Sequence, residues 1–152
     1  MQTATQLSVS LVNKPGKLAA VLTALSKEKV NLQALSVMDT RGRSTLRMVP
    51  DDPALARSAL ETIGATFEEH EVLLVSLPGQ SGAFSKVCER LAAEHLNIDY
   101  AYSSFAQAKG AKAGPLAVIK VNHLAKAQRV LSEGVSTESR RKKPGRRPVH
   151  AR

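Results

Sequence analysis

The sequence predicts an α+β fold of two ferredoxin-like βαββαβ units in tandem, with antiparallel sheets, helices on one face and a disordered basic C-terminal tail. Two observations predict this fold. Apolar residues alternate with a period of two in some stretches and recur with the helical period of 3.6 in others, in the order β-α-β-β-α-β. The pattern then returns 66 residues later, because Gly82 takes the place of Gly16 (82 − 16 = 66).

The repeat holds at several positions in one register. It includes the glycine that opens the first helix of each unit, the apolar stripe of that helix and the asparagine that starts the next strand. Such agreement at a single offset indicates two copies of one unit. The matched pairs are Gly16 and Gly82, Leu18 and Phe84, Val21 and Val87, Leu25 and Leu91, Glu28 and Glu94, Asn31 and Asn97, and Leu32 and Ile98.

The first unit has clear local signals. Leu7, Val9 and Leu11 alternate with polar residues, which predicts a strand with one buried face and a polar face. Asp52 is a suitable N-cap for the second helix, and Gly42 suits a left-handed position in a turn. We expect strands at 6–12, 32–38, 44–49 and 66–70, and helices at 17–29 and 53–63.

The second unit lacks one strand. We expect strands at 72–77, 98–105 and 116–121, helices at 83–95 and 123–133, and a mobile hairpin at 106–114. No convincing fourth strand follows, so that edge is left open or is covered by another segment or chain. The expected divisions are a first domain at 1–70, a second at 71–133 and the tail at 134–152.

The net charge of +9 belongs mostly to the tail. Seven of the 22 basic residues lie between Arg140 and Arg152, so the rest carries 15 basic residues (22 − 7) against 13 acidic ones. A single cysteine, Cys88, suits a reducing compartment, and we expect a cytoplasmic protein. The N-terminus has no signal-peptide pattern, and no apolar run is long enough for a membrane span.

These residues carry a resemblance to a known family. A strand followed by Asn13, Pro15, Gly16 and Leu18, then a helix ending in Val30-Asn31-Leu32, resembles the ACT domain over about residues 6–133. The resemblance implies a non-catalytic regulatory protein that binds an amino acid and needs no cofactor. It also implies a homodimer with ligand sites between paired domains, and an allosteric role, either alone or toward a separate biosynthetic enzyme.

The resemblance also implies the ligand-binding residues. In the family, the loop asparagine of one chain and the strand-start asparagine of another contribute to the site. Asn13's counterpart in the second unit is Gly79, which weakens that loop as a source of side-chain contacts. The expected ligand-binding residues are Asn13, Lys14, Pro15, Gly16, Lys17, Leu18, Asn31, Gly79, Gln80, Ser81, Gly82, Ala83, Phe84 and Asn97.

The chemistry of such a site can be argued from the residues themselves. A helix that opens at glycine offers free backbone N–H groups and a positive dipole end to a carboxylate. An asparagine amide can accept from an ammonium and donate to a carboxylate. Structural alternatives stay open. Pro15-Gly16 could serve only to start a helix, and Asn31 and Asn97 could serve only to end a helix in a left-handed conformation.

Other candidate residues have plainer interpretations. Cys88 lies on an apolar helix stripe and is expected in the core. The four histidines show no metal spacing, and Tyr100 and Tyr102 fit a sheet face or interface better than ligand stacking. No catalytic pair or phosphate loop stands out, so an enzyme is disfavoured.

The tail gives an alternative function, because its Gly145-Arg146-Arg147-Pro148 run resembles an AT-hook core with an extra arginine. A basic arm binds nucleic acid weakly and without sequence preference. The residues concerned are Arg140, Arg141, Lys142, Lys143, Arg146 and Arg147. A solvated tail without a partner is the plainer interpretation.

Overall fold

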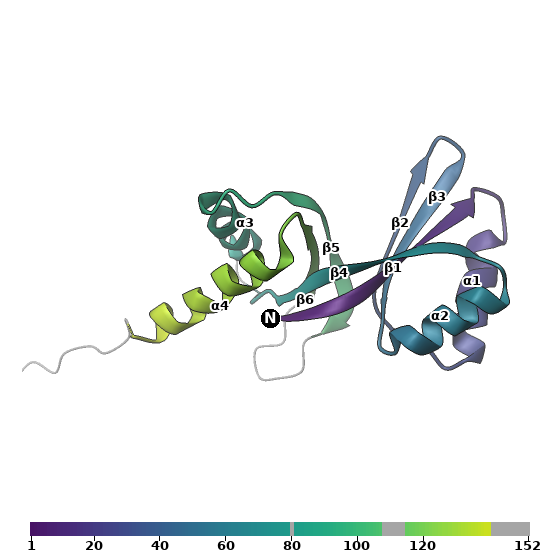
Figure 1. Cartoon of the computed structure of the whole chain (residues 1–152), viewed down its shortest axis with the longest axis horizontal. Helices are drawn as coiled ribbons and strands as arrows, with labels where there is room; N and C mark the ends of the chain where they lie inside the picture. Colours follow the sequence, from purple (N-terminus) through teal and green to yellow (C-terminus); the bar gives the residue numbers. More distant parts are fainter. Residues whose placement is uncertain (80, 108–114, 141–152) are drawn as a thin grey trace, which may run out of the picture.

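The computed structural model describes residues 1–79, 81–107 and 115–140 (Figure 1). The chain is α+β, with two βαββ units, each with a second helix, following one another as the repeat predicts. The elements are β1 (Gln2–Val12), α1 (Lys17–Lys27), β2 (Leu32–Thr40), β3 (Arg43–Pro50), α2 (Pro53–Thr62), β4 (Thr66–Ser76), α3 (Ala83–Ala93), β5 (Ile98–Gln107), β6 (Pro115–Val121) and α4 (Leu124–Arg140).

The six strands form one antiparallel sheet in the order β2-β3-β1-β4-β6-β5. The strands β1 and β4 lie at its centre and cross the molecule from one unit to the other (Figure 1). Their register runs from the pair Gln2 and Leu74 to the pair Ser10 and Thr66. The two units therefore share a sheet through their first strands.

The structure has one continuous strand where the sequence predicts two. The segments 66–70 and 72–77 both lie in β4, which has no glycine or proline to interrupt it. The proposed boundary between residues 70 and 71 consequently falls inside a strand. The first half of β4 is the fourth strand of the first unit, and the second half is the first strand of the second unit.

The open edge of the second unit is covered by the chain itself. β1 begins at Gln2, earlier than expected, and its extra residues pair with the second half of β4. On its other side, that half of β4 pairs with β6, from Leu73 and Ile119 to Ser76 and Leu116. The start of β1 thus occupies the place of the missing fourth strand.

The four helices pack on one face of the sheet and bury two separate clusters. One cluster lies under α1 and α2 and the other under α3 and α4, in agreement with the predicted apolar stripes. The largest buried side chains are Leu7, Leu25, Leu46, Met48 and Leu60 in the first cluster, and Leu73, Leu91 and Ile119 in the second.

The helix-free face also has an apolar core, formed by Ala34, Val49, Val72, Leu74 and Val118. The sheet curls so far that its edge strands, β2 and β5, come into contact. The sequence predicts that Gln6 lies on a polar, exposed face of β1, and this prediction is wrong for Gln6. Gln6 is fully buried, because β5 of the second unit covers it.

The turns and helix ends show what local pattern predicts well and less well. Gly42 is left-handed at φ 82°, as expected, and the Asp52 side chain caps α2 by accepting from the Leu55 N–H at 3.1 Å. The helices α1 and α3 end two residues earlier than expected. Their C-terminal left-handed residues are Lys29 and His95, which are again counterparts (29 + 66 = 95).

The C-terminal segment differs from the expectation of disorder from residue 134. Helix α4 continues to Arg140 and extends away from the body (Figure 1). The expected tail beyond residue 140 and the hairpin at 108–114 lie outside the described residues. Within the described residues, no helix is both long and apolar enough to cross a membrane.

Candidate functional site

The loop between β1 and α1 lies against the turn between β2 and β3. The Asn13 N–H donates to the Gly42 carbonyl at 3.1 Å, and the Lys17 N–H donates to the Lys14 carbonyl at 3.3 Å. Asn13, Lys14, Pro15, Gly16 and Lys17 are all exposed, whereas Leu18 turns back onto the core. The loop is thus held by its backbone while its side chains face solvent.

The starts of α1 and α3 share a geometry that α2 lacks. Gly16 and Gly82 both stand before their helices in a left-handed conformation, at φ 86° and 82°, and neither helix has a side-chain cap. A Cβ added at either glycine would meet nothing within 4 Å. The glycines are therefore required by φ rather than by crowding, and neither helix start has a side chain that caps its amides.

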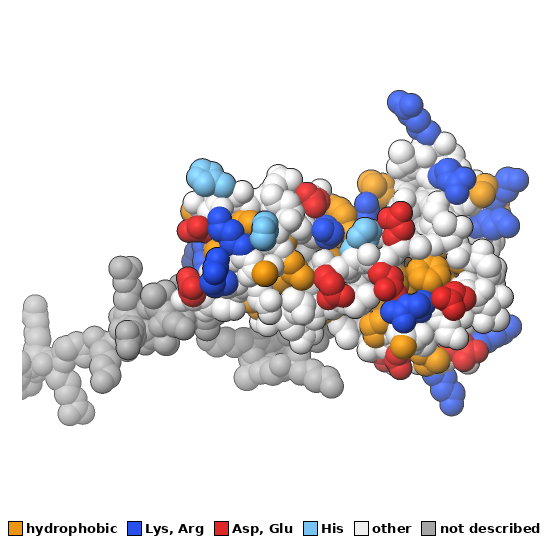
Figure 2. Space-filling view, viewed as in Figure 1, with side chains coloured by type: hydrophobic (Ala, Val, Ile, Leu, Met, Phe, Trp, Pro, Cys, Tyr) orange, Lys and Arg blue, Asp and Glu red, His pale blue; other side chains and the backbone are white. Residues whose placement is uncertain are grey.

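The first loop lies at a basic end of the molecule. Lys14, Lys17, Arg41 and Arg43 are exposed around it, and Figure 2 shows Lys and Arg side chains gathered at this end. Arg43 also donates to the Ser10 hydroxyl at 3.1 Å. These cations add to the helix dipole, so a carboxylate is favoured at this place.

The second loop offers backbone rather than charge. Gly79, Ser81 and Gly82 are exposed, Ala83 is half-buried, and Gln80 lies outside the described residues. Phe84, in the first turn of α3, is 38% exposed.

Asn31 and Asn97 occupy equivalent strand starts, and neither is left-handed, so that structural alternative is wrong. The Asn31 side chain donates to Asp51 at 3.2 Å, and the Asn97 side chain donates to Asp99 at 3.1 Å. The hydrogen bond from Asn31 is the largest influence holding the pKa of Asp51 below its usual value, against a smaller opposing effect of burial. Both asparagines thus have local structural partners.

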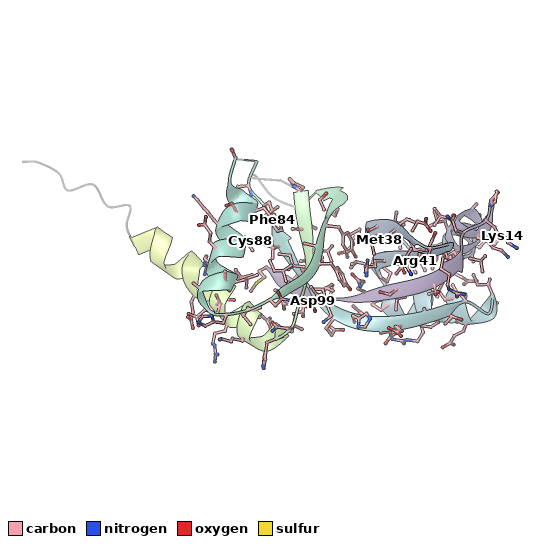
Figure 3. All side chains as sticks on the ribbon, turned by 90° about the horizontal axis from the view of Figure 1, so that it is seen from above. Lys14, Met38, Arg41, Phe84, Cys88 and Asp99 are labelled. Atoms are coloured by element: carbon pink, nitrogen blue, oxygen red, sulfur yellow. The ribbon has the colours of Figure 1, made fainter. Side chains whose placement is uncertain are left out.

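One chain does not bring the loop and strand-start residues together. Gly16 and Asn31 lie at opposite ends of α1, whose 11 residues span about 16 Å. Because β1 and β4 are antiparallel, the loop after β1 and the loop after β4 lie at opposite ends of the pair. Figure 3 places Lys14 far from both Phe84 and Asp99. Within one chain, Gly16 therefore lies apart from Asn31, and the first loop lies apart from the strand start that carries Asp99.

A polar cluster that the sequence pattern missed joins the two units on the helix-free face. The Gln6 amide donates to the Tyr100 hydroxyl at 2.6 Å and accepts from the Tyr102 hydroxyl at 2.8 Å. The Arg47 guanidinium lies 4.0 Å from the centre of the Tyr100 ring. Both tyrosines were expected on a sheet face or interface, but only tertiary structure could pair them with Gln6 and Arg47.

Burial dominates the electrostatics of this cluster. It raises the pKa of Tyr102 far above its usual value, Tyr100 adds to the rise, and Arg47 opposes it. The buried Arg47 Nε has no hydrogen-bond partner among the described residues. The cluster is therefore a junction between the units that favours the neutral hydroxyl of Tyr102.

Two of the hollows formed by the described residues lie near the predicted loops. A groove of about 510 Å³ lies between α1 and α2 and begins at Gly16. A smaller pocket of about 200 Å³ lies beside Phe84. Cys88 is half-buried, and in the described part of the chain no group of His, Cys, Asp and Glu could hold a metal ion.

The fold and the paired loops define a class of protein in which two ferredoxin-like units share one sheet and repeat one glycine-opened helix start. The chain belongs to the ACT domain pair family, whose sequence pattern matches residues 2–134. The resemblance in the first loop and strand is thereby confirmed. ACT domain pairs are typical of amino-acid-binding regulatory modules.

Solved structures agree with this assignment. The chain is 33% identical to protein BT0572 from Bacteroides thetaiotaomicron, with a TM-score of 0.78, over 87% of this chain and 88% of that one. It matches the ligand-free regulatory subunit of aspartate kinase from Thermus thermophilus at 17% identity and a TM-score of 0.58, over 86% of this chain and 91% of that one. The latter likeness concerns the fold alone. No curated protein matches the chain.

Proposed function

We propose that this protein is a non-catalytic regulator that binds a small amino acid through the loop before α1, with the equivalent loop before α3 as a second site. The observation that carries the proposal is the repeated helix start at Gly16 and Gly82 within an ACT domain pair. Both helices begin without a side-chain cap, so first-turn amides, apart from the Lys17 N–H that donates to Lys14, remain available to a carboxylate. Asn13 beside the first helix start can contact the ligand's ammonium.

The proposal includes a homodimer, with each site formed by a loop of one chain and a strand start of the other. The separation of Gly16 from Asn31 along α1 supports a two-chain site. Aspartate kinase regulatory subunits have the same fold, which supports a role in regulating a separate enzyme in trans. We also propose a cytoplasmic location, in keeping with the single cysteine.

Thermal unfolding of the full chain against the twenty amino acids tests binding. A ligand that binds only the native state at a hundredfold its Kd stabilises by about 2.7 kcal/mol, a readily measured shift in Tm. Asn13→Ala should abolish the shift and leave the Tm of the free protein unchanged. Gln128→Ala, which removes an exposed amide on α4, is the matched control and should bind like the parent. Gly16→Val is less suitable because valine is strained at φ 86°.

Light scattering on the same samples tests the dimer. A monomer that still binds an amino acid would contradict the two-chain site, and an unshifted Tm with every amino acid would contradict the function. In the latter case, the basic residues from Arg140 onward would be tested next with nucleic acid. Binding there should weaken steeply as salt rises.

A further inference from the structure

The pocket beside Phe84 lies where β4 ends and α3 begins. It has a volume of about 200 Å³ and is lined by Leu77, Phe84, Ala101, Tyr102, Ser103 and Ala117. Phe84 is only partly covered, and Ala101 is exposed on the edge strand β5. Figure 3 shows Phe84 on the first turn of α3, directly after the second loop. The pocket is therefore next to one of the two proposed carboxylate positions.

The repeat explains why the pocket exists in the second unit. Leu77, Phe84 and Ala101 correspond to Leu11, Leu18 and Leu35 (77 − 66 = 11, 84 − 66 = 18, 101 − 66 = 35). Leu11 is buried in the cluster of the first unit, and Leu18 and Leu35 pack against it. The second unit thus has an alanine where the first unit fills its core with a leucine.

The strand registers show a second position where the first unit has a leucine and the second unit has an alanine. Ala117 pairs with Val75 and Ser103, and Leu46 pairs with their counterparts Val9 and Val37 (75 − 66 = 9, 103 − 66 = 37). Leu46 is fully buried, and Ala117, which is also buried, has three side-chain carbons fewer. Ala101 and Ala117 both line the pocket, at places where the first unit has leucines.

We propose that this pocket receives the side chain of an aliphatic amino acid, of the size of leucine, isoleucine, valine or methionine. This inference rests on the proposed function and adds the class of ligand to the second site. A cavity of about 150 Å³ lined by Leu, Ile and Phe side chains is known to bind benzene, so about 200 Å³ suits one branched aliphatic group. Four of the six lining residues are Leu, Phe or Ala, the Tyr102 hydroxyl already donates to Gln6, and the lining has no charged side chain, which disfavours aspartate or lysine.

The test measures the binding of four compounds: leucine, aspartate, lysine and isocaproate, which is the leucine skeleton without its ammonium group. Thermal shifts are recorded for the full-length parent and for Ala117→Leu, which restores the residue of the first unit. Ala92→Leu, on the exposed side of α3, adds the same atoms outside the pocket and is the matched control. Magnetic resonance of isotope-labelled alanine methyl groups reports on Ala101 and Ala117 in the parent, so a folding defect in a variant does not decide the result.

We expect leucine to raise the Tm and move the Ala101 and Ala117 methyl signals, with no effect of aspartate or lysine. Ala117→Leu should weaken leucine binding at least tenfold, and Ala92→Leu should leave it unchanged. If amino acids bind but neither methyl signal moves, the pocket inference is overturned and the proposed function stands. If only isocaproate moves the signals, the pocket takes an aliphatic chain that is not part of an amino acid, and both the pocket inference and the proposed amino-acid ligand are overturned. If no compound has an effect, both are overturned.

Discussion

Thr5 and Glu71 face each other at the centre of the β1–β4 pair, and each is the counterpart of the other in the repeat (5 + 66 = 71). The Thr5 hydroxyl donates a 2.7 Å hydrogen bond to the Glu71 carboxylate. Where a residue pairs with its own repeat counterpart, the axis that relates the two copies passes between the two residues. The two units are therefore related by an approximate twofold axis, and each supplies the strand that closes the other.

Removal of residues 1–5 should destabilise the second unit more than the first. These residues include the part of β1 that pairs with Leu74 through Glu71 and covers the edge of β4. Hydrogen exchange of the β4 and β6 amides should speed up, while the amides of β3 stay protected. Removal of residues 141–152 is the control and should change neither. Equal loss of protection in both units would contradict the closing role of β1.

Gln6→Ala should destabilise the fold by about 1–3 kcal/mol, because it leaves the hydroxyls of two half-buried tyrosines without their partner. A double-mutant cycle with Tyr102→Phe, measured by urea unfolding, should give a coupling of about 0.5–3 kcal/mol. Gln2→Ala, at an exposed position of the same strand, should stay within about 0.5 kcal/mol of the parent. Additive effects of the Gln6 and Tyr102 substitutions would show that the junction does not couple the units.

Stability should fall as the pH rises above about 10, the usual pKa of tyrosine. Burial raises the pKa of Tyr102 in the folded chain, so the unfolded chain loses this proton first. The unfolded state then binds fewer protons, and the stabilisation that is fully present below pH 10 is progressively lost. Urea midpoints from pH 8 to pH 11 should decline less in Tyr102→Phe than in the parent. Parallel curves would contradict the assignment.

Asn31→Ala should raise the pKa of Asp51 part of the way back to its usual value. The side-chain hydrogen bond is lost, while the Asn31 backbone N–H still donates to Asp51. A lowered folded-state pKa gives stability that is present above the unfolded value, near 3.9, and is lost as the pH falls through the folded one. A carboxylate titration by magnetic resonance measures the change. Asn97→Ala is the matched control in the second unit and should leave Asp51 unaltered.

Leu46→Ala should create in the first unit the hollow that Ala117 leaves in the second. Leu46 is fully buried, so we expect a loss of about 2–5 kcal/mol in the free energy of unfolding. Ala117→Leu, which adds atoms to existing space, should lose far less. Chemical denaturation of both variants makes the comparison, and equal losses would show that the two positions are packed alike.

The strand and helix stretches could be read from the sequence because each pattern is local. The alternation of Leu7, Val9 and Leu11 marks the side of β1 that the helices cover, and Asp52 marks the start of α2. The 66-residue offset also identified the equivalent helix starts at Gly16 and Gly82. These features depend on residues that are close in the sequence and on local backbone geometry, so they can be predicted from the amino-acid sequence.

Only the tertiary structure decided how the units are joined. Gln6 looks like a surface residue in a period-two strand, and it is buried because a strand some ninety residues away in the chain curls over it. The missing fourth strand of the second unit is likewise supplied by the start of β1, the first strand of the first unit. The pocket beside Phe84 is lined by Ala101 on β5 and Ala117 on β6, where the first unit has leucines. These two positions are far apart in the sequence and come together only when the two strands pair. Such contacts form between distant segments, where no local periodicity constrains them, whereas the repeat, the helix starts and the fold class were determined by the sequence itself.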